Sequence, residues 1–90
     1  MSIKIEIHII LREFTDGRKV AEVKGETVGD CLRDLVRQFP ALEGKLLDKQ
    51  GKLANSLAVF LNRESPYPEE LRKKVSDGDI ISILMMIDGG

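Results

Sequence analysis

An isoleucine-rich segment near the end of the chain constrains the fold more than any other feature. Residues 80–84 follow the triplet Asp77-Gly78-Asp79 and precede the pair Gly89-Gly90. Asp and Gly favour a chain reversal, and a short β-branched run after such a turn is typical of a strand. The sequence therefore predicts a central last strand that leads directly into a short extended arm ending in two glycines.

Alternating apolar residues predict a first strand over residues 3–11, with the odd-numbered side chains facing inward. The only histidine, His8, is then expected on the outward face as a solvated residue. The Asp-Gly pair at 16–17 predicts a hairpin turn, after which residues 19–24 return as a second, more polar strand.

The middle of the chain predicts one main helix and a third strand. Thr27 is expected to cap the helix, with Asp30 bonding back to the cap, and Pro40 to end it. Cys31 falls in the apolar stripe of this helix, where a buried side chain is expected. Residues 57–61 alternate as a strand with odd positions inward, which gives an α+β fold.

Length and charge limit the classes of function. Ninety residues predict a single domain over residues 1–90. The net charge of −1, from 14 basic and 15 acidic residues, argues against nucleic acid or an anionic membrane as a partner. The chain has no apolar run long enough to span a membrane and one cysteine, so we expect a cytoplasmic protein.

Residue patterns that carry catalysis do not occur in the sequence. It contains no cysteine pair or histidine cluster for a metal and no glycine-rich loop with a lysine for phosphate. Glycines at 89–90 would instead let the terminal backbone pass through a channel too narrow for any Cβ atom. The chain is therefore predicted to be a carrier or substrate that holds no metal or cofactor, rather than an enzyme.

The ending resembles that of the MoaD/ThiS sulfur carriers, and of MoaD most closely. Archaeal ubiquitin-like small modifiers are also similar. The motif falls on Asp77-Gly78-Asp79, Ile81, Ile83, Ile87 and Gly89-Gly90, with upstream matches at residues 25–32 and Leu61-Asn62. The chain departs from the family pattern at Met85-Met86, where many members have proline, and at Asp88, where a small residue is usual.

The resemblance implies a ubiquitin-like β-grasp fold. Its mixed sheet would have the order 2-1-5-3, with the last strand counted as the fifth, and one helix on one face. Residues 85–90 would form a flexible C-terminal tail.

The resemblance also implies a function. An adenylating enzyme would use ATP to activate the carboxylate of Gly90, which would become a thiocarboxylate. Its sulfur would serve molybdopterin synthesis, with the large subunit of molybdopterin synthase as a partner. Three alternatives stay open. The sulfur could serve thiazole formation or another acceptor, or Gly90 could be joined to lysines as in a protein modifier. The chain could also be a non-covalent binding module.

Two groups of residues are expected to contact partners. The first is the tail, where the adenylating enzyme would recognise Gly89, Asp88, Ile87, Met86 and Met85. The second is a docking surface on the outward face of the sheet. If the last strand lies between the first and third, strand alternation makes Ile10, Leu84 and Phe60 neighbours there.

Overall fold

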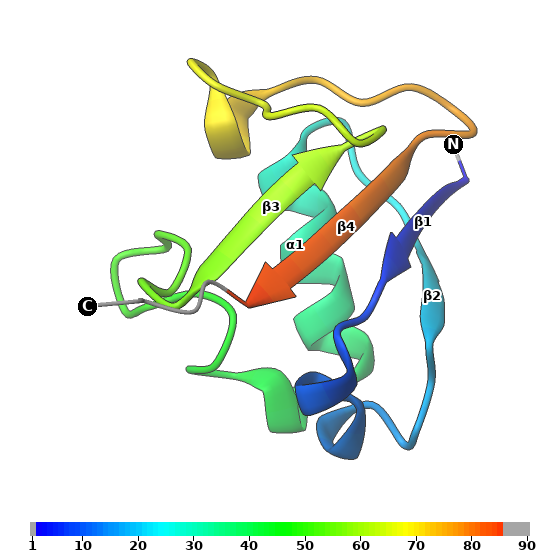
Figure 1. Ribbon diagram of the computed structural model, residues 1–90, viewed down its shortest axis with the longest axis vertical. Coiled ribbons are helices and arrows are strands. Elements are labelled where there is room, and N and C mark those ends of the chain that lie inside the picture. The colour runs from blue at the N-terminus through cyan, green and yellow to red at the C-terminus, as the bar shows by residue number, and fades with distance from the viewer. Residues whose placement is uncertain (1, 86–90) are drawn as a thin grey trace.

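The computed structural model describes residues 2–85, which form a four-stranded sheet, one main helix and three short 3₁₀ segments (Figure 1). In chain order the elements are β1 (Ile3–Glu6), η1 (Ile9–Phe14), β2 (Val20–Val23), α1 (Val28–Gln38), η2 (Pro40–Leu42), β3 (Leu57–Leu61), η3 (Glu70–Arg72) and β4 (Ile80–Met85).

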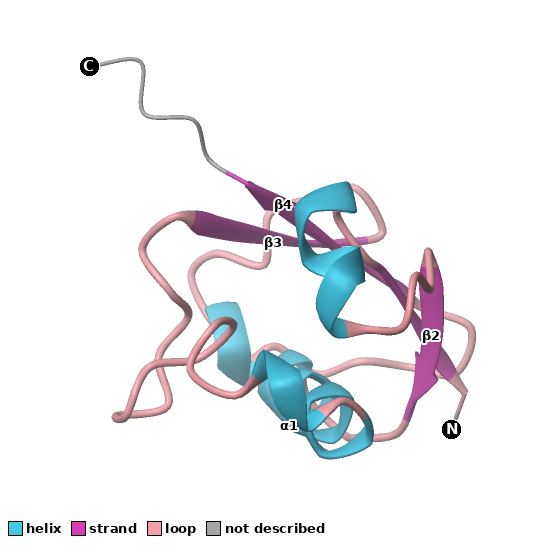
Figure 2. Ribbon diagram, turned by 90° about the horizontal axis from the view of Figure 1, so that it is seen from below, coloured by secondary structure: helices cyan, strands magenta, loops and turns pink. Residues whose placement is uncertain are grey.

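The sheet has the order β2-β1-β4-β3. β1 and β4 run parallel, and the other two pairings are antiparallel. This confirms the β-grasp prediction, with the last strand between the first and third, although it is the fourth strand here and not the fifth. α1 packs across one face of the sheet, and most of the opposite face stays open (Figures 1 and 2).

The N-terminus of α1 is fixed by side-chain hydrogen bonds. The Oγ1 atom of Thr27 accepts from the backbone N–H of Asp30 at 3.1 Å, which confirms the predicted cap. The Asp30 carboxylate accepts from the N–H of Glu26 and not from that of Thr27, so its bond falls one residue earlier than expected. The Arg33 side chain also donates to the Asp30 carboxylate, and this bond, together with the one from the N–H of Glu26, lowers the pKa of Asp30.

The core lies between α1 and the sheet. α1 contributes one stripe of buried side chains and the inward faces of the strands contribute the other. The fully buried members include Ile3, Ile5, Leu32, Leu35, Ile81 and Ile83.

The first strand is shorter than its alternating sequence predicts. Pairing in β1 ends at Glu6, and the chain then turns into η1. His8 caps η1 through Nδ1, which accepts from the N–H of Ile10 at 3.2 Å. This turn brings Leu11 back into the core but leaves Ile9 67% exposed. The prediction that Ile9 faces inward and that His8 and Ile10 lie on a strand was therefore wrong.

The last strand is longer than predicted. Met85 belongs to β4 and pairs with Leu57, and its side chain packs against the core. The expected tail over residues 85–90 therefore starts one residue too early. Within residues 2–85, no helix is both long enough and apolar enough to cross a membrane.

Gly25 gives a direct test of the packing at the start of α1. A Cβ atom there would lie 2.6 Å from Cβ of Asp30 and 2.9 Å from the backbone nitrogen of Cys31. We expect Gly25→Ala to lower the free energy of unfolding by about 1–3 kcal/mol, the usual cost of overpacking. Urea denaturation measures this. The neighbouring Glu26→Ala, at an exposed side chain, should change stability by less than about 0.5 kcal/mol, and equal effects would contradict the packing argument.

Candidate functional site

β4 anchors the end of the described chain. Its side chains Ile81 and Ile83 are 0% and 1% exposed, and the strand is hydrogen-bonded on both sides, to β1 and to β3. The strand thus fixes the position and direction in which the chain leaves the sheet. The predicted tail residues Met86, Ile87, Asp88, Gly89 and Gly90 lie outside the described residues.

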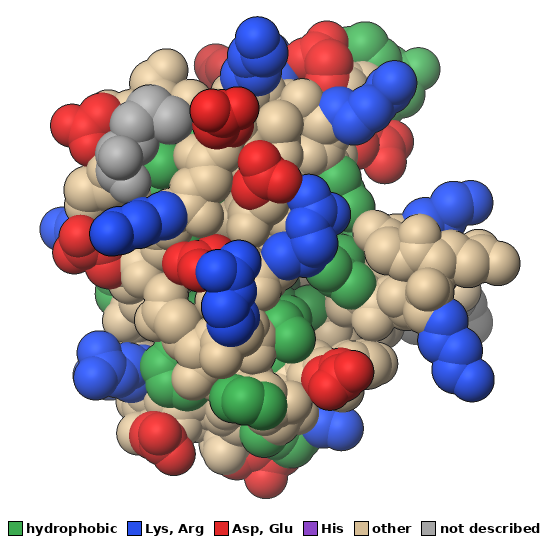
Figure 3. All heavy atoms as spheres, turned by 180° about the vertical axis from the view of Figure 1, so that it is seen from behind, with side chains coloured by type: hydrophobic (Ala, Val, Ile, Leu, Met, Phe, Trp, Pro, Cys, Tyr) green, Lys and Arg blue, Asp and Glu red, His purple; other side chains and the backbone are tan. Residues whose placement is uncertain are grey.

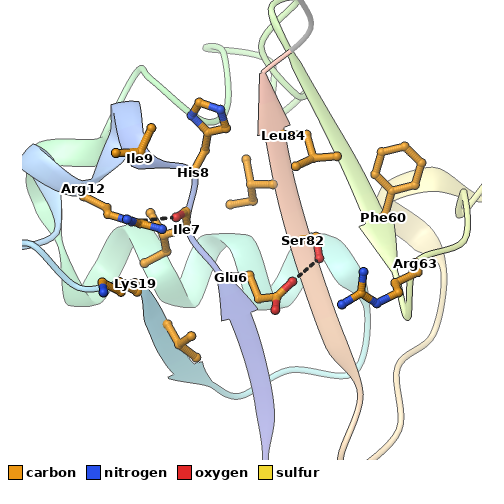
Figure 4. A pocket seen from close by; sticks show the side chains of 12 residues that line it. Glu6, Ile7, His8, Ile9, Arg12, Lys19, Phe60, Arg63, Ser82 and Leu84 are labelled. Carbon is orange, nitrogen blue, oxygen red and sulfur yellow. Dashed lines mark hydrogen bonds between the residues drawn. The ribbon is translucent and has the colours of Figure 1, made fainter.

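A groove of about 710 Å³ lies on the open face of the sheet (Figure 4). We call it the open-face groove. Its middle is apolar, and polar and charged side chains surround that middle. The lining residues are Glu6, Ile7, His8, Ile9, Arg12, Lys19, Val20, Phe60, Arg63, Ser82, Ile83 and Leu84.

The structure brings together two of the three residues predicted to form the docking surface. Leu84 is 45% exposed, and Phe60 is half-buried beside it without joining the core. Both line the open-face groove, and Phe60 pairs with Ser82 while Leu84 pairs with Ala58. Ile10 is exposed but does not line the groove. Ile9, which the strand pattern placed inward, lines it instead.

Several charged residues of the groove were missed by the sequence reasoning. The hydroxyl of Ser82 donates to Oε1 of Glu6 at 2.7 Å across the β1–β4 pairing. Arg12 is tied at one end, because its Nε–H donates to the carbonyl of Ile7 at 3.1 Å. Lys19 lies beside Arg12, and Arg63 lies on the other side of the groove near Phe60 (Figure 4).

Arg63 owes its place to the turn that follows β3. Asn62 fixes this turn through its side chain, whose Oδ1 accepts from the N–H of Ile80 at 2.9 Å and whose Nδ2 donates to Asp79 at 3.0 Å. Asn62 and Arg63 both adopt left-handed backbone angles, with φ of 52° and 67°. Arginine rarely adopts this conformation, and holding it costs of order 1 kcal/mol or more.

Residues 2–85 present neither a reactive thiol nor a metal-holding cluster of side chains. Burial raises the pKa of the Cys31 thiol to about 11, so it is a poor nucleophile as predicted. Residues 2–85 also place no group of three or more His, Cys, Asp or Glu side chains to hold a metal ion. What the face offers is apolar contact area beside the exit of β4, with charges around it.

Comparison with known proteins identifies relatives of this chain by sequence and by fold. The ThiS family model matches residues 6–90. The sulfur carrier protein CysO of Mycobacterium tuberculosis is 30% identical, with all of both chains covered. CysO in the Amycolatopsis orientalis BexX/CysO complex is 31% identical at a TM-score of 0.87, covering 98% of this chain and 99% of that one. SAMP1 from Haloferax volcanii is 28% identical at a TM-score of 0.85 over the whole of both chains.

By name, these relatives are sulfur carrier proteins and a small archaeal modifier protein. The family match takes in nearly the whole fold, from the end of β1 to the two glycines. The chain therefore belongs to the ThiS family.

Proposed function

We propose that the protein is a sulfur carrier that acts through the carboxylate of Gly90. The observation that carries this proposal is the ThiS family match, which runs through the strand β4 to the glycine pair at its end. The relatives named as sulfur carriers align with the chain over its whole length. A buried, doubly paired β4 would give the arm a fixed starting point.

The proposed chemistry takes place in a partner enzyme. A carboxylate is a poor electrophile, so an ATP-dependent adenylating enzyme would first join Gly90 to AMP and release pyrophosphate. Hydrosulfide would then attack the acyl carbon and displace AMP, and loss of the proton leaves a thiocarboxylate. Gly89 and Gly90 fit this step because neither carries a side chain that a narrow channel would exclude. ATP is used by the partner, and we propose no cofactor on this chain.

The sulfur acceptor is a finer question. Sulfur delivery to a pterin precursor in molybdopterin synthesis, with the large subunit of molybdopterin synthase as partner, stays a prediction from the resemblance to MoaD. The similarity to CysO supports a carrier without supporting that acceptor in particular. A transfer assay with a purified large subunit and the pterin precursor tests this acceptor directly. The readout is the loss of sulfur from the carrier.

Protein modification is a second candidate function. The observation in its favour is the similarity of the whole chain to SAMP1 of Haloferax volcanii. SAMP1 is named as a small archaeal modifier protein. The same acyl-adenylate would supply it, because a lysine amine can displace AMP to form an isopeptide bond. Mass spectrometry of lysine-linked Gly-Gly remnants distinguishes this outcome from sulfur transfer.

The proposed thiocarboxylate can be detected on the intact protein. We expect incubation with the adenylating enzyme of the same organism, ATP and a sulfide source to raise the mass by the difference between sulfur and oxygen. One equivalent of iodoacetamide should then add at the terminus, because burial and the raised pKa protect Cys31. Intact mass spectrometry follows both steps.

Two variants provide the controls for this assay. Deleting Gly90, or Gly89→Val, should abolish the mass gain without changing the unfolding midpoint, because the described core is formed within residues 2–85. A Gly90-deleted protein that still acquires sulfur would contradict the proposal. So would alkylation of the treated protein at Cys31 alone.

A second test concerns the predicted docking surface. Phe60 is half-buried in the open-face groove and outside the core, and aromatic residues are common interface anchors. We expect Phe60→Ala to weaken binding to the adenylating enzyme by more than about 1 kcal/mol. Isothermal titration calorimetry measures the affinity, and thermal denaturation measures the stability of the variant.

Tyr67→Ala is the matched control, since Tyr67 is 75% exposed and does not line the open-face groove. It should leave the affinity unchanged. If Phe60→Ala instead lowers the free energy of unfolding by about 3–5 kcal/mol, as for a core aromatic, the residue supports the fold and the docking role is wrong.

A further inference from the structure

The charges around the open-face groove are strongly unequal. Arg12, Lys19 and Arg63 line it together with a single acidic residue, Glu6. The whole chain, by contrast, carries a net charge of −1. On the face covered by α1, acidic and basic side chains are intermingled (Figure 3). The basic surplus is therefore a local property of the groove.

The three cations of the groove have no carboxylate partner within residues 2–85. The ion pairs in this part of the chain join Arg33 to Asp30, Arg37 to Asp34 and Lys73 to Glu69. All three lie outside the groove. The one acidic residue of the groove, Glu6, accepts its hydrogen bond from Ser82. The cations consequently keep their capacity for a partner's carboxylates.

The two arginines are positioned differently, because a hydrogen bond holds the side chain of Arg12 whereas the turn after β3 places the backbone of Arg63. Arg12 is half-buried, and its Nε–H bond to Ile7 fixes the plane of the guanidinium group and leaves the two terminal nitrogens available. Arg63 stands on a left-handed backbone with φ of 67°. Strain of this kind at an exposed side chain points to a role in binding, because the turn itself would be easier to form with glycine.

We propose that the open-face groove binds an acidic protein segment, which deepens the docking role proposed above for the same face. An apolar side chain of the segment would lie between Ile9, Leu84 and Phe60. Carboxylates on either side of it would reach Arg12 and Arg63, since a guanidinium group can bind a carboxylate through two parallel hydrogen bonds. Lys19 would add to the attraction beside Arg12.

Charge excludes two other occupants of this groove. A second copy of the chain, packed face to face, would set its own cations against these cations, and like charges at an interface are unfavourable. Nucleic acid is disfavoured because an apolar middle separates Arg12 and Lys19 from Arg63, so the groove offers no continuous basic track for phosphates.

The test uses the full-length ¹⁵N-labelled protein and three synthetic peptides. All three share a central Leu-Phe pair, flanked by Glu and Asp, by Gln and Ser, or by Lys. We expect the acidic peptide to bind about tenfold or more tightly than the neutral one, through charge-assisted contacts. Its chemical-shift changes should fall on groove amides such as Ile9, Arg63 and Ser82, and the binding should weaken as salt is added.

Variants of the two arginines make the test specific. Arg12→Gln and Arg63→Gln should each remove most of the preference for the acidic peptide, whereas Arg37→Gln, on α1 and outside the groove, should leave it intact. Arg12→Lys keeps the charge but loses the bond to Ile7, so it should recover only part of the affinity. Arg63→Gly should lose the preference while its melting temperature stays equal or rises, because glycine relieves the left-handed conformation.

Equal binding of the three peptides, a preference for the basic peptide, or no shift at groove amides at millimolar peptide would overturn the proposal. Tighter binding of a single-stranded oligonucleotide at the same amides would also overturn it. The peptides require neither ATP nor adenylation. A negative peptide titration therefore does not contradict the thiocarboxylate proposal. A negative thiocarboxylate assay likewise does not change the meaning of the peptide titration.

Discussion

Two strand pairings hold β4 in the middle of the sheet, and the rest of the structure depends on them. β1 binds it on one side in parallel and β3 on the other in antiparallel register, while Ile81 and Ile83 fill the core beneath. A strand paired on both sides and buried on one face cannot shift register without exposing its isoleucines. The chain therefore leaves the sheet next to Leu57, at a fixed place.

The same pairings build the open-face groove. Inward side chains of β3 and β4 belong to the core, so their alternate residues, Phe60, Ser82 and Leu84, must face the open side. The core and the candidate docking surface are thus two sides of one strand pair. This explains how a chain of 90 residues can combine a stable body with a broad surface beside the exit of its last strand.

Sequence patterns predicted the elements whose signals are local. The Thr27 cap, α1 and the strand β3 follow from periodicity and capping, and they appear as expected. The period-two pattern failed beyond Glu6, because the His8 cap and the Arg12 bond to Ile7 favour a 3₁₀ turn that apolar alternation does not reveal. The basic residues of the groove come from three separate segments, so only the folded chain brings them together.

We propose that the folded body docks through its open face while β4 directs the arm toward the partner. NMR titration of the full-length labelled protein with its adenylating enzyme and ATP tests this most directly. We expect amides of the open-face groove and those of Gly89 and Gly90 to lose intensity together, at the same enzyme concentration, while α1 amides are affected least. Loss confined to the two glycines, or centred on α1, would contradict it.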